Sequence, residues 1–498
     1  MLCGVGHVDI FTKREFLVHK HGSDSMKKFL NAFKKYFVDF GIAVAKGDIW
    51  CKLSLLVMGA GYWGRKQIVK GIMMTLLEVV VLLFTGMFSI NYIKDLNTLG
   101  TVQYESKFDP LTMKNTVNDY DNSLLILLYG IVGIIVIIAF ILLYISNMKA
   151  VYRLQLMKEQ GEHINTFRED LKELVNGKFY VTLLTLPSIG VILMNVIPII
   201  FMSCVAFTNY DENHMPPNYL FTWVGLNNFK TMFTGGGATI TFSYAFIRIL
   251  AWTMIWAVTA TFTTFIGGIL LAKLINHENT HFKKMWRSLF VVTIAIPQFV
   301  TLLLVSKMFS DHGIMNTWCS NIGLTSFLKH AGVISTNYIP FLSKPGWSHV
   351  MIILINIWVG VPYQMLTATG ILMNIPTDQL ESARIDGANK WQIFWKITMP
   401  YVLFICGPSL VQGVISNINN FNVIYLLTSA NATANMAFAN SNAKETDLLI
   451  TWLFTLTNDN SNYKMASVIG IISFVICALL TLLSYSRMIS GDKEEVYQ

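Results

Sequence analysis

The pattern His277-Glu278-Asn-Thr-His281 is the first stretch whose residue types could do chemistry, because it matches the H-E-x-x-H signature of zinc proteases. On a helix, this spacing places both imidazoles on one face to bind zinc, with the glutamate as general base. The context opposes this reading, since the motif follows an apolar run ending near Ile275 and precedes Lys283-Lys284. An intramembrane zinc protease therefore stays as an alternative, while we expect no bound metal and no catalytic residues.

A phosphate-binding loop of the type G-x-x-x-x-G-K-[ST] would allow the chain to hydrolyse ATP. The nearest fragment is Gly177-Lys178, which is followed by Phe179 and has Lys172 in place of the first glycine. We therefore predict that the chain is not an enzyme, has no ATPase site of its own and needs no cofactor.

Polar side chains crowd one late apolar run; they are Gln412, Ser416, Asn417, Asn419, Asn420 and Asn422. Amides at membrane depth are costly unless they are paired, so hydrogen bonding between helices is one explanation. A ligand cavity is the other, because an amide both donates and accepts and so suits a sugar hydroxyl. Tyr363 offers an aromatic face for a sugar ring, and the nearby Gly360 leaves room for it. Both explanations stay open.

The segment 376–400 is a polar interruption that still has the pattern of ordered helix. Asp378 and Glu381 predict a capping box at the start of a short helix, and Gly387 predicts a left-handed residue that ends it. A second helix is expected from Trp391 to Ile397. Four apolar side chains make this segment a predicted docking surface; they are Ile385, Trp391, Phe394 and Ile397.

The composition places these motifs in a membrane. Hydrophobic residues make up 53% of the 498 residues, charged residues only 13%, and the mean hydropathy is +0.51, whereas soluble domains carry roughly 25% charged residues. The net charge of +8 would suit nucleic acid only if the cations clustered on one soluble face. They fall in particular loops instead, so we expect no nucleic-acid partner.

Apolar runs long enough to span a bilayer recur along the chain, at about 72–92, 123–146, 179–207, 246–272, 288–309, 350–373, 402–425 and 465–486. They predict an all-α, multi-pass membrane bundle of about eight helices. Lysine and arginine are denser in alternate loops, which indicates that both termini are cytoplasmic. An ion-coupled secondary transporter is a further alternative, although the spans contain few carboxylates for coupling.

We expect five regions along the chain. They are a cytoplasmic segment 1–70 with an interfacial helix at Lys52–Trp63, three transmembrane helices in 71–210, a short extracellular loop 211–245, a core bundle 246–490 that contains the segment 376–400, and a cytoplasmic tail 491–498.

The run Glu381-Ser-Ala-(x2)-Asp386-Gly387-(x9)-Ile397-Thr-Met-Pro400 resembles the EAA loop of binding-protein-dependent ABC importer permeases, with Ser382 where that pattern has alanine. Runs 205–210, 223–229 and 311–316 look like the sugar-permease subfamily. The resemblance implies the type I ABC importer permease fold, in the form of the larger, eight-span subunit of maltose/maltodextrin importers. The large periplasmic domain of the best-known maltose importer is missing, as in permeases of Gram-positive bacteria.

The resemblance also implies functional positions. Those for coupling to an ATPase fall on Glu381, Ser382, Ala383, Asp386 and Gly387. Those for sugar contact fall on Val359, Gly360, Tyr363, Gly413, Ser416, Asn417 and Asn420. Gly413 and Ser416 depart from the best-known maltose importer, which has a hydroxyl and an aromatic residue there.

By the same resemblance, the chain is a permease subunit in the plasma membrane of a bacterium that translocates maltose, maltodextrin or a similar oligosaccharide. The implied partners are a second homologous permease, two ATPase subunits that bind ATP and magnesium, and an extracellular, lipid-tethered sugar-binding protein.

Overall fold

The computed structural model describes residues 31, 33–109, 113–234, 240–277, 279–428, 438 and 441–489. The chain separates into two compact units, Met1–Val224 and Gly225–Gln498. Helices dominate both units, which confirms the predicted all-α class. The described exception is a hairpin of two antiparallel strands, β1 (Ser106–Asp109) and β2 (Lys114–Val117).

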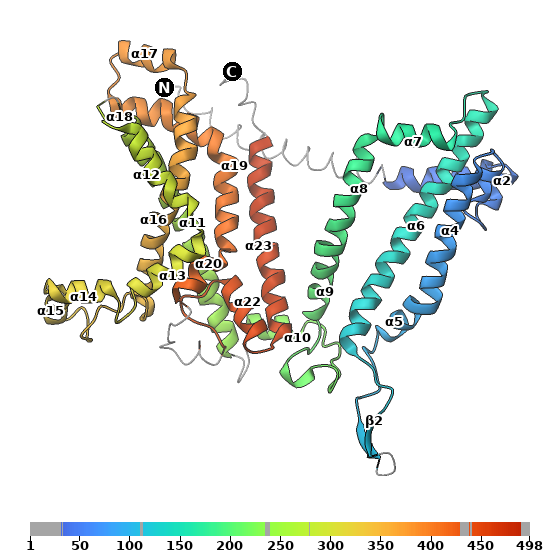
Figure 1. The fold of residues 1–498 in the computed structure, drawn as a ribbon, viewed down its shortest axis with the longest axis horizontal. Coiled ribbons are helices and arrows are strands. Elements are labelled where there is room, and N and C mark those ends of the chain that lie inside the picture. The colour runs from blue at the N-terminus through green and yellow to red at the C-terminus, as the bar shows by residue number, and fades with distance from the viewer. Residues whose placement is uncertain are drawn as a thin grey trace, which may run out of the picture. The chain divides into compact units, whose positions relative to one another are not determined.

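The first unit contains three apolar rods. The first rod joins α4 (Ile68–Phe84), the π-helical η1 (Thr85–Ser89) and α5 (Ile90–Asp95), and the second is α6 (Ser123–Glu159). The third joins α8 (Phe179–Val191), the π-helical η2 (Ile192–Val196) and α9 (Ile197–Val205). Figure 1 shows the short helices α2 (Ile49–Leu53) and α7 (Phe167–Val175) at one end of the rods and β2 at the other.

The predicted interfacial helix at Lys52–Trp63 does not form as one helix. The structure has α2, a series of turns and then α3 (Ala60–Trp63). Buried Ser54 supplies the reason, because its hydroxyl accepts a hydrogen bond from the Gly61 amide at 2.7 Å and closes the intervening loop. A separate helix occupies residues 33–46.

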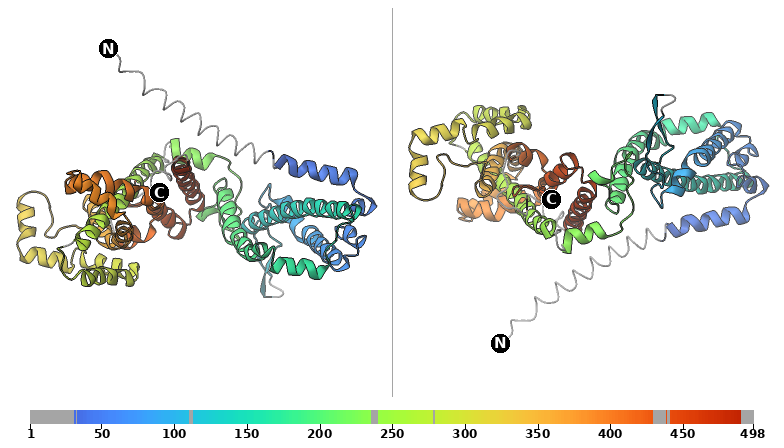
Figure 2. Two further views of the ribbon diagram at one scale, coloured as in Figure 1. Left: turned by 90° about the horizontal axis from the view of Figure 1, so that it is seen from above. Right: turned by 90° about the horizontal axis from the view of Figure 1, so that it is seen from below.

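The second unit surrounds the long helix α11 (Ile240–Asn276), which packs against α16 (Pro345–Met373) and α19 (Met399–Ile418). The remaining helices are α10 (Asn227–Thr234), α12 (Lys283–Ala295), α13 (Gln298–Met308), α14 (Ile314–Asn321), α15 (Leu324–His330), α17 (Thr377–Ile385), α18 (Lys390–Ile393), the π-helical η5 (Phe394–Thr398), α20 (Phe421–Thr428), α22 (Leu449–Asn458) and α23 (Tyr463–Ile489). Both views in Figure 2 place the yellow α14 and α15 at the margin of this unit.

Seven helices in the described residues are long and apolar enough to cross a membrane, and a bent pair makes up to eight. The bent pair corrects the prediction of one continuous span at 288–309, because α12 and α13 meet at 91°. Pro297 contributes to the break. A proline lacks the amide hydrogen that continues a helix and disfavours helical backbone in the residue before it, and Ile296 is accordingly extended with ψ 127°.

Candidate functional site

The segment 376–400 forms the expected helix, sharp turn and second helix. Gly387 follows α17 with φ +80°. The Gly387 amide donates to the carbonyl of Arg384 at 3.1 Å, and the Ala388 amide donates to that of Ala383 at 2.9 Å. This pair of bonds is a Schellman motif, in which a left-handed residue satisfies the last carbonyls of a helix. The prediction for Gly387 is confirmed in its conformation.

The capping interactions differ from the prediction. Pro376 occupies the N-cap position of α17, and Asp378 lies inside the first turn rather than capping it. The capping box stands at the second helix instead, where the Asn389 side chain accepts from the Gln392 amide at 2.8 Å and the Gln392 side chain accepts from the Asn389 amide at 2.9 Å. The turn is therefore held on both sides by local hydrogen bonds.

The two halves of this segment differ in burial. None of the residues of α17 is buried, and Ile385 is 85% exposed. Trp391 is 68% exposed, whereas Phe394 is only 5% exposed and belongs to a core cluster with residues of α11, α16 and α19. Phe394 therefore anchors the segment in the bundle, which corrects its predicted place on a docking surface, while Ile385 and Trp391 remain on the exposed face. Figure 1 shows α17 and α18 at one end of the second unit.

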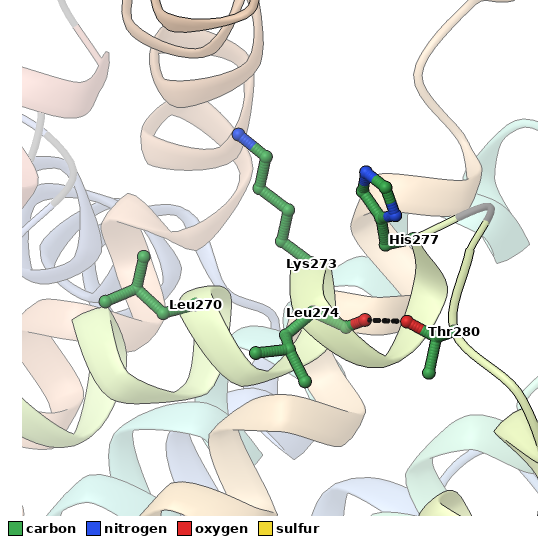
Figure 3. Close-up of a pocket in the computed structure, with 5 residues that line it drawn as sticks. All are labelled: Leu270, Lys273, Leu274, His277 and Thr280. Atoms are coloured by element: carbon green, nitrogen blue, oxygen red, sulfur yellow. Dashed lines mark hydrogen bonds between the residues drawn. The ribbon is translucent and has the colours of Figure 1, made fainter.

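Lys273, near the end of α11, adds a contact to this anchor. Its ammonium nitrogen lies 4.0 Å from the centre of the Phe394 ring, which is a cation–π geometry. Figure 3 shows Lys273 on α11 and His277, directly after the end of α11, with their side chains extending to the same side. They line an open pocket of about 400 Å³ with Leu270, Leu274 and Thr280.

The zinc alternative is not supported. Helix α11 ends at Asn276 and α12 begins at Lys283, so His277 and His281 lie in the turn between two helices. The helical spacing that would aim both imidazoles at one metal is therefore not formed. Glu278 lies outside the described residues, and among those described no group of three potential ligands has metal-binding geometry.

The predicted sugar-contact positions on two different helices both meet α11. A Cβ atom added to Gly360 of α16 would lie 2.7 Å from Cγ2 of Thr264, and one added to Gly413 of α19 would lie 3.1 Å from Cγ2 of Thr261. Gly360 thus allows a close approach of α16 to α11. In this structure the Thr264 side chain fills the space beside Gly360, and a sugar contact at Gly360 stays a prediction.

The amides are organised around Asn417. Its side-chain nitrogen donates to the Thr261 hydroxyl at 2.9 Å, and its side-chain oxygen accepts from Asn420 at 3.1 Å. The Trp256 indole donates to the Asn417 carbonyl at 3.1 Å. Helix α19 ends at Ile418 and α20 starts at Phe421, so these bonds tie a break in the helix to α11. In this arrangement the amides hold helices together.

The remaining predicted positions lie on the surface of this unit or at its edge. Tyr363 is 46% exposed and Ser416 is also exposed, while Val359 is partly buried against a core cluster. The structure therefore brings Gly360, Gly413, Asn417 and Asn420 together around α11 and leaves Tyr363 and Ser416 outside. Thr261 and Thr264 join the site although sequence reasoning missed them. The signal was the run of four hydroxyl residues at 259–264 inside an apolar span.

Comparison with known proteins defines the class. Residues 264–489 match the family model of the binding-protein-dependent transport system inner membrane component. This match covers α11 from Thr264 onward, the segment 376–400 and α19, so it includes the whole segment and Asn417, while Thr261 and Trp256 precede it.

Similar proteins extend the match to most of the chain. The maltodextrin transport system permease protein MalC of Streptococcus pneumoniae is 31% identical over 89% of this chain and 97% of its own length. The galactooligosaccharides transport system permease protein GanP of Bacillus subtilis is 30% identical over 89% and 98%. A crystal structure of a bacterial ABC transporter involved in alginate import is 21% identical with a TM-score of 0.48, over 64% of this chain and 99% of that one.

The chain therefore belongs to the permease subunits of binding-protein-dependent ABC importers, and it is a multi-pass membrane protein. The suspected resemblance to this family is confirmed.

Proposed function

We propose that this permease translocates a maltodextrin or a closely similar oligosaccharide. The observation that carries the proposal is the 31% identity to a maltodextrin permease along 89% of the chain. The galactooligosaccharide permease is nearly as similar, so galactooligosaccharides are the comparison substrates.

The proposed mechanism starts at the exposed end of the segment 376–400. A separate ATPase subunit docks on α17 and α18, with Glu381, Ser382, Ala383, Asp386 and the exposed apolar residues as contacts. ATP and magnesium bind in that ATPase, and this chain has no ATPase site of its own. Two ATPase copies, a second homologous permease and an external, lipid-tethered sugar-binding protein complete the importer. Both termini lie on the cytoplasmic side, where the ATPases are.

A continuous helical connection joins the docked helices to the amide junction, which is the hydrogen-bonded group of Thr261, Asn417 and Asn420. Helix α18 runs through η5 into α19 as one rod, and Phe394 packs in a core cluster with residues of α11 and α16. Asn417 lies near the far end of α19, where it bonds to Thr261. We infer that a push on α17 moves the rod as one body and opens the junction around Gly360, Gly413, Asn417 and Asn420 to the sugar. Val359, Tyr363 and Ser416 complete the sugar contacts together with the second permease.

The test is uptake by proteoliposomes that contain this chain with its second permease, ATPase and binding protein. We expect labelled maltotriose to enter only with internal ATP and magnesium, and excess maltohexaose to compete better than galactooligosaccharides. Preferred competition by galactooligosaccharides would overturn the proposed sugar. Uptake that follows an ion gradient and persists without ATP would overturn the importer mechanism in favour of a secondary transporter.

A further inference from the structure

The end of the first unit that carries α2 and α7 is shown in Figure 1, and apolar side chains are exposed there. We define the basic collar as residues 33–66, which contain the helix 33–46, α2 and α3. Ile49 is 73% exposed and Leu56 is 77% exposed, and the other exposed apolar residues include Phe33, Phe37, Ile42 and Trp50. The helix 33–46 and α2 contribute to this surface together.

The collar is also strongly cationic. Five lysines are exposed; they are Lys34, Lys35, Lys46, Lys52 and Lys66. The two carboxylates of the collar are both occupied, since Asp39 lies 3.5 Å from the Lys149 amine and Asp48 lies 3.2 Å from the Arg65 guanidinium. Burial acts to raise the pKa of Asp48, but the hydrogen bond from the Cys51 amide and the positive charge of Arg65 together outweigh burial and lower this pKa, so the carboxylate stays ionised and paired. The exposed face therefore carries net positive charge.

Contacts with α6 fix the collar at the end of a membrane-spanning helix. The Tyr36 hydroxyl donates to the Leu142 carbonyl at 2.9 Å and lies 2.6 Å from the Ser146 hydroxyl. The Lys149 amine lies 4.2 Å from the centre of the Tyr36 ring. Lys149 is the first charged residue of α6 after its long apolar run. The helix 33–46 is thus held where the span leaves the hydrocarbon.

We propose that the basic collar binds anionic phospholipid headgroups of the leaflet at this end of the first unit. Exposed apolar side chains at the level of a span end meet the acyl boundary, and adjacent lysines attract negative headgroups. A soluble partner would not explain why the apolar residues lie beside a membrane span. The inference is independent of the transported sugar and concerns a surface outside the coupling segment and the amide junction.

The experiment uses the full chain in nanodiscs and measures amide hydrogen exchange of residues 33–46. We expect exchange about tenfold slower with phosphatidylglycerol present than in phosphatidylcholine alone, because each lysine near the surface adds to the attraction. High salt should remove the difference, since exposed charges are screened.

Two triple variants separate headgroup binding from a general effect of charge. Replacing Lys34, Lys35 and Lys46 by glutamine should abolish most of the lipid-dependent protection. The matched control replaces three exposed lysines outside the collar, Lys94, Lys107 and Lys230, and should keep it. Equal exchange in both lipids, or full protection in the collar variant, would overturn the proposal. Protection that appears only when the ATPase subunit is added would overturn it in favour of a protein partner.

Discussion

Substitution of Gly387 tests the backbone conformation of the turn between α17 and α18 without disturbing side-chain contacts. A Cβ atom added there would meet no atom within 4 Å, so a side chain creates no clash. The substitution destabilises the turn only through the backbone angle, φ +80°. Holding a residue that has a Cβ atom in this left-handed conformation costs about 1–2 kcal/mol of conformational energy. Such a cost lowers the population of the native turn by a factor of about 5 to 30.

We therefore expect a graded series at this position. Gly387→Asn should keep most sugar uptake, because asparagine tolerates the left-handed region. Gly387→Ala should reduce it several-fold, and Gly387→Val should reduce it further because a β-branched residue is poorly tolerated there. The assay measures ATP-dependent uptake and ATP hydrolysis by the reconstituted importer. Lost stimulation of ATP hydrolysis by loaded binding protein would locate the defect in coupling.

Two controls make the result interpretable. Gly161→Ala imposes a similar strain, since Gly161 has φ +72° and open space around it, but it lies after α6 in the other unit. Gly370→Ala places a methyl group on α16 in open space without a positive φ. Both should transport normally. Equal uptake by the alanine, asparagine and valine variants of Gly387, at equal amounts of inserted protein, would refute the reasoning.

Three further predictions concern packing, the amide junction and pH. Gly360→Ala should destabilise the protein by about 1–3 kcal/mol by overpacking against Thr264, and the added change Thr264→Ser should restore much of the thermal stability; no rescue would contradict the close approach. Asn417→Leu should raise the KM for sugar at least several-fold, because the proposed mechanism has this amide bind the sugar. An unchanged KM, with equal loss of stability in Asn417→Leu and Thr261→Val, would limit the role of Asn417 to helix packing. Burial raises the pKa of the Asp447 carboxyl group from 3.8 to about 6. Between these two pH values the folded protein therefore keeps a proton on Asp447 that the unfolded chain releases. Stability should then fall by about 3 kcal/mol from about pH 4 to about pH 7, and a thermal unfolding series in which Asp447→Asn shows the same pH dependence would contradict this.

Hydropathy was sufficient to predict most of the spans, because a run of about 20 apolar residues has few other stable arrangements in a membrane. The break at Pro297 was harder to predict. Pro187, Pro362 and Pro408 lie inside helices that remain helical, so proline alone does not decide between a tolerated bend and a 91° break. The neighbouring helices decide it, and a single sequence does not specify them.

In the candidate site, too, local features could be predicted from the sequence and contacts between distant residues could not. Gly387 was predictable because a local backbone requirement fixes its conformation. The roles of Gly360 and Asn417 were not, since they depend on Thr264 and Thr261, about 100 and 150 residues away along the chain. The burial of Phe394 likewise depends on α11 rather than on its own segment.

The π-helical η5 affects the directions in which side chains point along the continuous helix formed by α18, η5 and α19. A π-helical turn contains one residue more than an α-helical turn. Relative to a regular α-helix of the same sequence, the side chains after η5 are therefore rotated by about 100° around the helix axis. Removal of one residue within 395–398, which keeps the buried Phe394, would return the segment to a regular α-helix and preserve the directions in which α18 and Asn417 face. Removal elsewhere in the rod would turn the amide away from Thr261. Changes in chain length between the ATPase-facing and sugar-facing ends are therefore tolerable at η5 alone along this rod.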